Sequence, residues 1–310
     1  MKILVSGGAG FIGSNLVKFL LSKDHEVIVI DNFSTGFKKN LQKELENIIL
    51  VENNLEDVYL DEYKGIDCFI HLAAQASVPI SINNFKKSSM SNILSSINAI
   101  DFCNNYNIPF IYASSSAIYG DLEIGDDNCS DIDLLSPYAA DKYFLEKYTK
   151  IFHSLNSFSS IGLRFFNVYG PYQDPKNPYS GVISIFVDKI RAKESIEING
   201  GNQTRDFIYV EDVARVIYKS IQIASQRKTC EVINVLTGKT TSINKLAEII
   251  SKKLNYEAKK IYKPLAKGDP LKSDGTTSKM EIFLDIDTNE LTKIDEGLEK
   301  TINFIKNSHF

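Results

Sequence analysis

Short runs of apolar, mostly β-branched residues alternate along the first half of the chain with amphipathic segments of helical period. The apolar runs predict buried strands at residues 3–5, 27–30, 48–51, 68–71, 110–113 and 161–165. The amphipathic segments predict helices at residues 11–21, 83–105 and 136–155. Strands and helices that alternate in this way form a parallel sheet covered by helices on both faces. The sequence therefore predicts an α/β fold built on a doubly wound parallel sheet.

The pattern becomes irregular after residue 167. Three prolines and two glycines between residues 170 and 181 exclude long regular elements there. A strand and helix at residues 207–220 and a strand at 231–235 are expected to rejoin the sheet, and residues 242–254 have a helical pattern. We expect a first domain at residues 1–167, with returns near 205–235. A smaller, discontinuous C-terminal lobe is expected at residues 168–204 and 236–310.

The composition is that of an ordinary soluble globular protein, with 310 residues of which 43% are apolar and 24% charged. A net charge of -4 and a pI near 5.7 provide no basic surface for nucleic acid. No stretch approaches the roughly 20 apolar residues of a membrane span, so we expect a cytoplasmic protein that binds neither nucleic acid nor a membrane. The cysteines and histidines are scattered without ligand spacing, and no metal site is expected.

A glycine-rich segment directly follows the first strand and opens the first helix. Gly8, Gly10 and Gly13 fit the spacing G-x-G-x-x-G, and Gly7 permits a second match of the same segment. Missing side chains let the backbone approach a pyrophosphate, whose charge is stabilised at the helix N-terminus. A turn that is merely flexible is the alternative. The order of the elements favours a Rossmann nucleotide-binding domain.

Asp31 ends the second strand, close to the separation of about 20 residues expected for a carboxylate that binds an adenosine ribose. A negative charge at this position repels a 2′-phosphate. The cofactor is therefore expected to be NAD rather than NADP. The alternative is an aspartate that caps a turn or a helix.

Tyr138 and Lys142 are one turn apart on the predicted helix at residues 136–155. Such a tyrosine can take a proton from a hydroxyl group while a cofactor takes the hydride, and the lysine is expected to favour the phenolate. Spacing alone is not diagnostic, because it recurs at Tyr143/Lys147, Tyr172/Lys176 and Tyr256/Lys260. Tyr143 lies roughly 140° round the helix from Tyr138. Ser115 favours Tyr138, because it ends a parallel strand where open sheets bind ligands, although it also suits a loop of small residues.

With these motifs the chain resembles the extended short-chain dehydrogenase/reductase superfamily, in particular its nucleotide-sugar 4-epimerases. The resemblance covers nearly the whole chain and rests on the segments GGAGFIGS, DNFSTG, HLAAQASVPIS, SSSAIYG, SPYAADK, RFFNVYGPYQDP, TRDFIYVEDVA and PLAKGDP. It implies an NAD-dependent inversion at carbon 4 of a UDP-sugar through a 4-keto intermediate. It also implies a homodimer that pairs through the two long predicted helices.

The resemblance also implies roles for individual residues. Tyr138 is implied as the general base, Ser115 as the hydrogen-bond partner of the reacting sugar oxygen, and Lys142 as the residue that holds the nicotinamide ribose. NAD is expected to be bound by Gly7, Gly10, Phe11, Ile12, Gly13, Asp31, Asn32, Asn54, Leu55, Ala73, Ala74, Asn92, Tyr138 and Lys142. The UDP-sugar is expected to be bound by Ser77, Ser115, Ser116, Asn167, Arg205, Asp269 and Ser273. A surface salt bridge to Asp206 or Asp212 is the alternative for Arg205.

Three positions depart from the family pattern. Asn54 stands where relatives often carry an aspartate, and its amide still accepts a hydrogen bond. Ala266 stands where they often carry an arginine, and the neighbouring Lys267 can neutralise a phosphate but cannot bind it bidentately. Ile80 replaces a further arginine, and nothing in the sequence explains this change.

The choice of reaction and substrate rests on three positions. Ser116 and Ala117 occupy the places where dehydratases carry an Asp-Glu pair, so elimination of water is not expected. Ser273 occupies a place where relatives restricted to non-acetylated sugars carry a bulky aromatic residue, so UDP-GlcNAc and UDP-GalNAc should fit. The UDP-glucose/UDP-galactose pair stays open. The alternatives are a reductase, decarboxylase or heptose epimerase of the same superfamily, or a non-enzymatic NAD-binding regulator.

Overall fold

A seven-stranded parallel sheet forms the centre of the larger part of the molecule in the computed structural model, which describes residues 1–177, 180–265 and 270–307. The strand order is β10-β6-β5-β4-β1-β2-β3, and every neighbouring pair is parallel. The strands are β1 (Lys2–Ser6), β2 (Glu26–Asp31), β3 (Ile48–Glu52), β4 (Cys68–His71), β5 (Phe110–Ser115), β6 (Ser160–Phe165) and β10 (Cys230–Val235). The predicted doubly wound sheet is confirmed.

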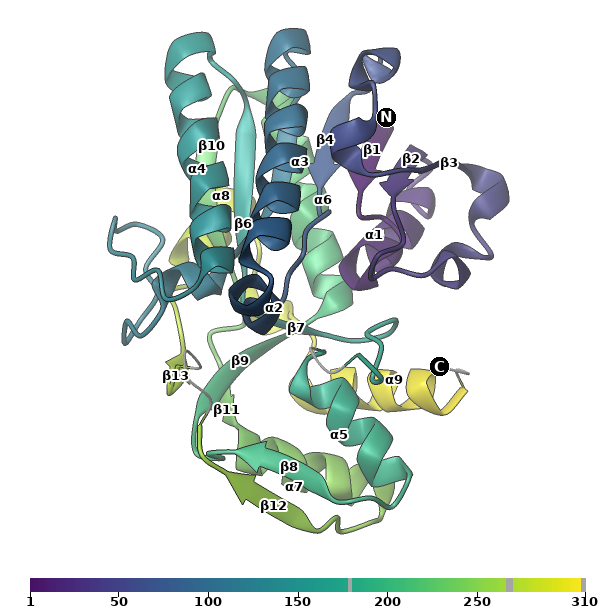
Figure 1. Ribbon diagram of the computed structural model, residues 1–310, viewed down its shortest axis with the longest axis vertical. Helices are drawn as coiled ribbons and strands as arrows, with labels where there is room; N and C mark the ends of the chain where they lie inside the picture. The colour runs from purple at the N-terminus through teal and green to yellow at the C-terminus, as the bar shows by residue number, and fades with distance from the viewer. Residues whose placement is uncertain (178–179, 266–269, 308–310) are drawn as a thin grey trace.

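Helices cover both faces of this sheet. Alternate residues of one strand face opposite layers: Ile3 and Val5 pack in the core below α1 (Phe11–Leu21) and α6 (Val210–Gln226), whereas Leu4 packs in the core below the opposite layer. Figure 1 shows the two long helices of that opposite layer, α3 (Phe85–Tyr106) and α4 (Pro137–Asn156), side by side. Strands buried on both faces are apolar throughout, which explains the unbroken apolar runs in the sequence.

The helix expected at residues 83–105 is observed as α3. A short helix, α2 (Val78–Asn83), precedes α3, and the chain turns at Asn84, whose φ of -125° and ψ of 46° are not helical. The Ser77 side chain accepts a hydrogen bond from the Ile80 backbone N–H and so caps α2 at 3.3 Å.

A small lobe packs below the sheet in Figure 1. It contains a four-stranded sheet of β7 (Asn167–Tyr169), β9 (Thr204–Tyr209), β11 (Thr240–Ser242) and β13 (Lys272–Ser273), and a two-stranded sheet of β8 (Ile196–Asn199) and β12 (Lys260–Lys263). Its helices are α5 (Val182–Arg191), α7 (Ile243–Leu254) and α9 (Ile294–Asn307), which enclose a separate apolar core. Short elements complete the described chain: α8 (Ser278–Leu284), and the 3₁₀ helices η1 (Lys38–Leu41), η2 (Leu45–Asn47), η3 (Leu55–Asp57), η4 (Leu60–Tyr63), η5 (Ser116–Tyr119) and η6 (Thr288–Glu290).

The strand expected near residue 207 does not rejoin the main sheet. β9 pairs with β7, β11 and β13 in the small lobe, and only α6 and β10 return to the larger part. The edge of the main sheet beside β6 is occupied by β10, which leaves no place there for β9. Within the described ranges, no helix is long and apolar enough to cross a membrane.

Candidate active site

A cavity of about 1990 Å³ lies where the carboxyl ends of the parallel strands face the small lobe. Open parallel sheets bind their ligands at this end. The predicted residues that line the cavity are Gly7, Gly10, Phe11, Ile12, Gly13, Asp31, Asn32, Asn54, Leu55, Ala73, Ala74, Ser77, Ser115, Ser116, Tyr138, Lys142, Asn167, Arg205 and Ser273. Asn92 lies behind the wall, and Asp269 lies outside the described residues. The fold therefore brings the residues predicted to bind NAD and those predicted to bind the UDP-sugar to one cavity.

The glycine loop leaves the backbone at the N-terminus of α1 open to the cavity. Gly10 caps α1 in an extended conformation, and Gly7 adopts a positive φ of 73°. A Cβ atom on Gly13 would lie 2.1 Å from the Gly7 carbonyl oxygen, so a side chain there would force the loop apart. A bare helix N-terminus of this kind suits a pyrophosphate. The loop fits a bound dinucleotide.

Asp31 makes the turn contact that was the alternative interpretation from the sequence, and its side chain also reaches the cavity. One carboxylate oxygen accepts the Phe33 N–H at 2.8 Å, as in a turn, and the other accepts the Ala9 N–H of the glycine loop at 2.8 Å. The side chain nevertheless lines the cavity, and burial raises its pKa above the ordinary value. Each oxygen retains a further lone pair for a ribose hydroxyl.

Ser115 and Tyr138 come together from two different elements. Ser115 ends β5 and Tyr138 is in the first turn of α4, and their side chains are hydrogen-bonded. The Ser115 Oγ also accepts the Ala117 N–H at 3.1 Å. The Lys142 Nζ lies 6.0 Å from the centroid of the Tyr138 ring and donates to the Ala113 carbonyl oxygen at 2.8 Å. The Ser/Tyr/Lys set predicted from the sequence is thus one cluster, in which Tyr138 and Lys142 are buried and Ser115 is half-buried.

The pKa of the Tyr138 phenol differs from the sequence-based expectation. Burial raises this pKa above 10, the Ser115 hydrogen bond lowers it, and the charge of Asp141 raises it. Burial also lowers the pKa of Lys142 to about 8, so this lysine is itself less readily protonated. Burial and the Asp141 charge both raise the Tyr138 pKa, so the phenolate that the sequence led us to expect is not favoured in the protein by itself.

Asn92 is on α3 and acts from behind the cavity. Its Oδ1 accepts the Gln75 N–H at 2.8 Å, and its Nδ2 donates to the Asp141 Oδ2 at 3.0 Å. Asp141 directly precedes Lys142 on α4. Asn92 thereby fixes the segment that follows β4 relative to the helix that carries Tyr138.

Arg205, Asn167 and Ser273 converge on the small-lobe side of the cavity. Ser273 and Arg205 are register partners in the parallel pair β13 and β9. The Asn167 Nδ2 donates to the Ser273 Oγ at 3.3 Å and to the Asp206 carbonyl oxygen at 3.1 Å. Asp206 accepts the N–H groups of Thr237 and Lys239, and Asp212 pairs with Arg215. Ile80 also lines the cavity, while Ala266 and Lys267 lie outside the described residues.

The cavity is also lined by residues that were not among the predicted site residues, including Asn40 and Tyr172. Asn40 lies in η1, and its Nδ2 donates to the Ala9 carbonyl oxygen at 2.9 Å, which supports the glycine loop from below. Tyr172 has a φ of 70°, and the Lys18 Nζ lies 3.4 Å from its ring centroid. Tyr172 was within the RFFNVYGPYQDP motif, whereas no periodicity or motif marked Asn40.

The parallel sheet, the glycine loop and the Ser/Tyr/Lys cluster define an NAD-dependent enzyme of the extended short-chain dehydrogenase/reductase class. The chain belongs to the NAD dependent epimerase/dehydratase family, whose model matches residues 3–235. This membership confirms the expected enzyme class, its NAD cofactor and its relation to UDP-sugar epimerases.

Relatives match along the full length. A putative UDP-glucose 4-epimerase of Methanocaldococcus jannaschii is 37% identical over 320 residues, with 99% of each chain covered. A UDP-N-acetylglucosamine 4-epimerase from Methanobrevibacter ruminantium M1, solved with UDP-N-acetylmuramic acid, has a TM-score of 0.92 and 36% identity over 98% of each chain. A UDP-glucose 4-epimerase from Thermotoga maritima, solved with UDP-glucose, has a TM-score of 0.90 and 33% identity over 99% of each chain.

Proposed function

We propose that this enzyme interconverts UDP-GlcNAc and UDP-GalNAc by inverting carbon 4 of the sugar. The position of Ser273 carries the proposal: its small side chain lines the cavity beside Arg205 and leaves room for an N-acetyl group. The similarity to a UDP-N-acetylglucosamine 4-epimerase supports it. The similarity to UDP-glucose 4-epimerases supports UDP-glucose and UDP-galactose as further substrates.

The roles of the site residues follow from their positions. Bound NAD supplies a hydride acceptor that also returns the hydride. With NAD bound, the Tyr138 oxygen would take the proton of the 4-hydroxyl during oxidation at carbon 4 and would return it to the same sugar oxygen during reduction from the other face. Ser115, hydrogen-bonded to Tyr138, holds the reacting oxygen, and the Lys142 ammonium group lies 6.0 Å from the Tyr138 ring centroid, where its charge would stabilise a phenolate.

The two parts of the molecule bind different ligands. We infer that residues 1–167, with the return in α6 and β10, bind NAD, and that residues 168–204 and 236–310 bind the UDP-sugar. Arg205 suits the diphosphate because its planar guanidinium binds two phosphate oxygens at once. The buried free thiols of Cys68 and Cys103 are in keeping with a reducing compartment, and we infer that the enzyme acts in the cytoplasm.

Other reactions on this scaffold require groups at other positions. Ser116 and Ala117 supply no acid at the place where a leaving hydroxyl would need one, which disfavours dehydration. A reductase would consume reduced cofactor in proportion to product, whereas an epimerase leaves the cofactor unchanged. A regulator without activity would not need Ser115, Tyr138 and Lys142 in one cluster.

The test is to incubate the purified protein with UDP-GlcNAc and with UDP-glucose in separate samples without added NAD, and to follow the sugars by proton NMR. We expect UDP-GalNAc to form in the first sample, at the expense of UDP-GlcNAc and with no net change in cofactor. A matched sample of the Tyr138→Phe protein controls for contaminating activity. No epimer in either sample, with NAD present in the protein, would contradict the proposal.

We also propose that the protein is a homodimer. Met90, Leu94 and Ile97 form an exposed apolar stripe on α3, with exposed fractions of 51%, 46% and 42%. Tyr148, Ile151 and Leu155 form a second exposed stripe on α4, which packs beside α3 (Figure 1). Stripes with this spacing are typical of helices that pack against further helices. A second copy, related by a two-fold axis, offers the same face and would cover both stripes in a four-helix bundle.

A further inference from the structure

A buried ion pair lies behind the serine turn of the cavity. Glu146 is on α4, two turns beyond Tyr138, and its carboxylate binds Arg164 of β6 with N–O distances of 2.9 and 2.7 Å. The same carboxylate accepts the Ser114 hydroxyl at 2.5 Å. Ser114 precedes Ser115 on β5, and Glu146 is on the helix that carries Tyr138. This hydrogen bond therefore sets the spacing between Ser115 and Tyr138, and it does not involve the side chains on the other side of Arg164.

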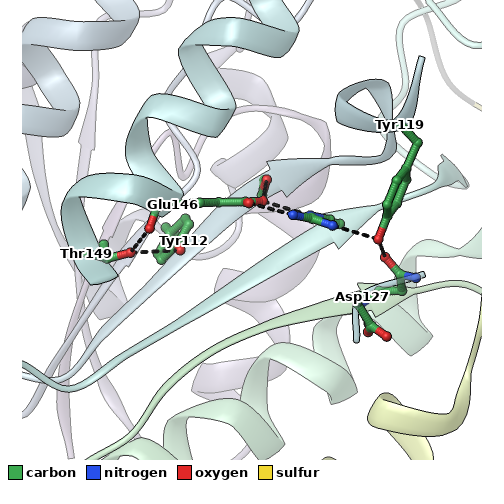
Figure 2. Close-up of polar contacts among 8 residues, drawn as sticks. Tyr112, Tyr119, Asp127, Glu146 and Thr149 are labelled. Carbon is green, nitrogen blue, oxygen red and sulfur yellow. Dashed lines mark hydrogen bonds and ion pairs between the residues drawn. The ribbon is translucent and has the colours of Figure 1, made fainter. Parts of the chain in front are cut away.

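The Tyr119 hydroxyl extends this network of hydrogen bonds, part of which Figure 2 shows. It accepts the Arg164 Nη1–H at 2.7 Å and donates to the Asn234 Oδ1 at 2.7 Å. Tyr119 ends η5, the turn that begins directly after Ser115, and Asn234 is on β10. All three side chains are buried. A single hydroxyl group therefore joins the serine turn to the edge of the main sheet.

Asn234 in turn holds the segment that follows Ser273. Its Nδ2 donates to the carbonyl oxygens of Gly125 and Thr276 at 3.0 and 3.3 Å. The backbone of Gly125 is bonded on both sides, because its N–H donates to the Asp274 carbonyl at 2.9 Å and its carbonyl accepts the Thr276 N–H at 3.0 Å. The position of Ser273 at the cavity wall thus depends on contacts made one to three residues further along the chain.

We propose that Tyr119 is a positioning residue for the UDP-sugar: its hydroxyl fixes segment 274–276, and through it Ser273, relative to the serine turn. The inference rests on the proposed UDP-sugar site. In a buried network with every member satisfied, removal of one hydroxyl leaves two polar groups each short of a partner and permits other arrangements. We expect the change to affect the small-lobe side of the cavity around Ser273. Ser115 and Tyr138 should stay in place, because the hydrogen bond between Ser114 and Glu146 is kept.

Tyr119→Phe tests this proposal, and Tyr112→Phe is its matched control. Both tyrosines are buried and belong to one network (Figure 2), but among the residues that the structure describes the Tyr112 hydroxyl bonds only to Thr149 on α4, at 3.0 Å. For Tyr119→Phe we expect the KM for the UDP-sugar to rise about tenfold while kcat changes less than about twofold, because the substrate wall is loosened and the reacting groups are not. NAD content should stay that of the wild type.

Hydrogen–deuterium exchange gives a second measurement that does not depend on activity. We expect faster exchange in peptides that cover residues 270–277 for Tyr119→Phe, and wild-type exchange there for Tyr112→Phe. If Tyr119→Phe does not fold, Thr276→Val replaces it. This half-exposed threonine donates to Asp126 and Asp127 at 3.3 Å, and its loss should produce the same changes in smaller measure.

The outcomes separate the two proposals. Wild-type exchange in residues 270–277 of both test variants, an unchanged KM, or equal changes in the Tyr112→Phe control would overturn the role of Tyr119. A wild-type protein that turns over no UDP-sugar would overturn the proposed function instead, and the exchange measurement would still decide the role of Tyr119.

Discussion

The ammonium nitrogen of Lys142 lies 2.8 Å from the backbone carbonyl oxygen of Ala113, two residues before Ser115. This contact joins α4, which carries Tyr138, to β5, which carries Ser115. Lys142 therefore has two consequences for the site: its charge lies near the Tyr138 ring, and its side chain helps to set how α4 lies on the sheet. Variants of Lys142 should therefore change both the chemistry and the position of α4, whereas variants of Tyr138 should change only the chemistry.

Replacement of the Tyr138 hydroxyl should abolish most of the activity without loss of the cofactor. We expect Tyr138→Phe to lower kcat by about 10²- to 10⁴-fold, the usual contribution of a positioned general base. Tyr143→Phe on the same helix is the control and should keep nearly full activity, because Tyr143 does not line the cavity. Initial rates with UDP-GlcNAc and the NAD content of each protein measure both effects. Unaltered turnover of Tyr138→Phe would exclude Tyr138 as the base.

Local patterns were sufficient to predict the elements that hold the site. The predicted helix at residues 11–21 has the observed bounds of α1, and the helix predicted at 136–155 begins within a residue of α4. Ser136 explains the second boundary, since its side chain caps α4 by accepting the Ala139 N–H. Caps, glycine loops and buried strands are all encoded within a few neighbouring residues, so they can be read from one sequence.

Long-range relationships could not be predicted in the same way. The pairing of Ser273 with Arg205 joins residues 68 positions apart, and β9 has the composition of a strand in either sheet. The Tyr119–Asn234 hydrogen bond likewise depends on how β5 and β10 are ordered around β6. The raised pKa of Tyr138 follows from its burial, which a residue pattern does not measure. These features depend on the assembled fold.

Lys142 should make the stability of the cofactor-free protein depend on pH. Burial lowers its pKa from the ordinary value of 10.5 to about 8 in the folded chain. Between these two values the unfolded chain holds a proton that the folded chain has released, so the free energy of unfolding contributed by Lys142 rises with pH. Below pH 8 both states are protonated, and the folded state carries the full cost of the buried charge.

The measurement compares the wild type with Lys142→Met by urea unfolding at several pH values. The difference in unfolding free energy, wild type minus variant, should rise by about 1 to 3 kcal/mol between pH 7.5 and 10. Taking the difference cancels the buried thiols of Cys68 and Cys103, whose raised pKa values act in the opposite direction. A difference that stays constant with pH would mean that Lys142 keeps its ordinary pKa.

Asp31 should determine the preference for NAD over NADP. Asp31→Asn removes the negative charge that repels a 2′-phosphate, and it also weakens the acceptor for the Ala9 and Phe33 N–H groups. We expect weaker binding of NAD, and a ratio of NADP to NAD dissociation constants at least about tenfold smaller than in the wild type. Calorimetric titration of cofactor-stripped protein gives both constants. An equal loss for the two cofactors would leave Asp31 with a structural role only.

The apolar face of α3 and α4 should hold the dimer together. Light scattering on the wild type should give twice the chain mass of 34.8 kDa. Leu94→Glu with Ile151→Glu places charges in the middle of both stripes and should give monomers at micromolar concentration. Ile282→Glu is the control: Ile282 is 84% exposed but lies on α8, outside this face. A monomeric wild type, or a double variant that stays dimeric, would contradict the proposed interface.

Ser273 should decide which sugars fit. A tyrosine at this position would extend from β13 into the cavity beside Arg205, and would also remove the hydroxyl that accepts the Asn167 Nδ2–H at 3.3 Å. Ser273→Ala removes only the hydroxyl and is the control. We expect Ser273→Tyr to lower kcat/KM for UDP-GlcNAc and UDP-GalNAc by about 10- to 100-fold more than for UDP-glucose and UDP-galactose, because only the acetylated sugars need the space that the ring fills. Ser273→Ala should change the two pairs alike. If Ser273→Tyr depresses both pairs equally, the side chain at this position supports the wall of the cavity but does not select the sugar.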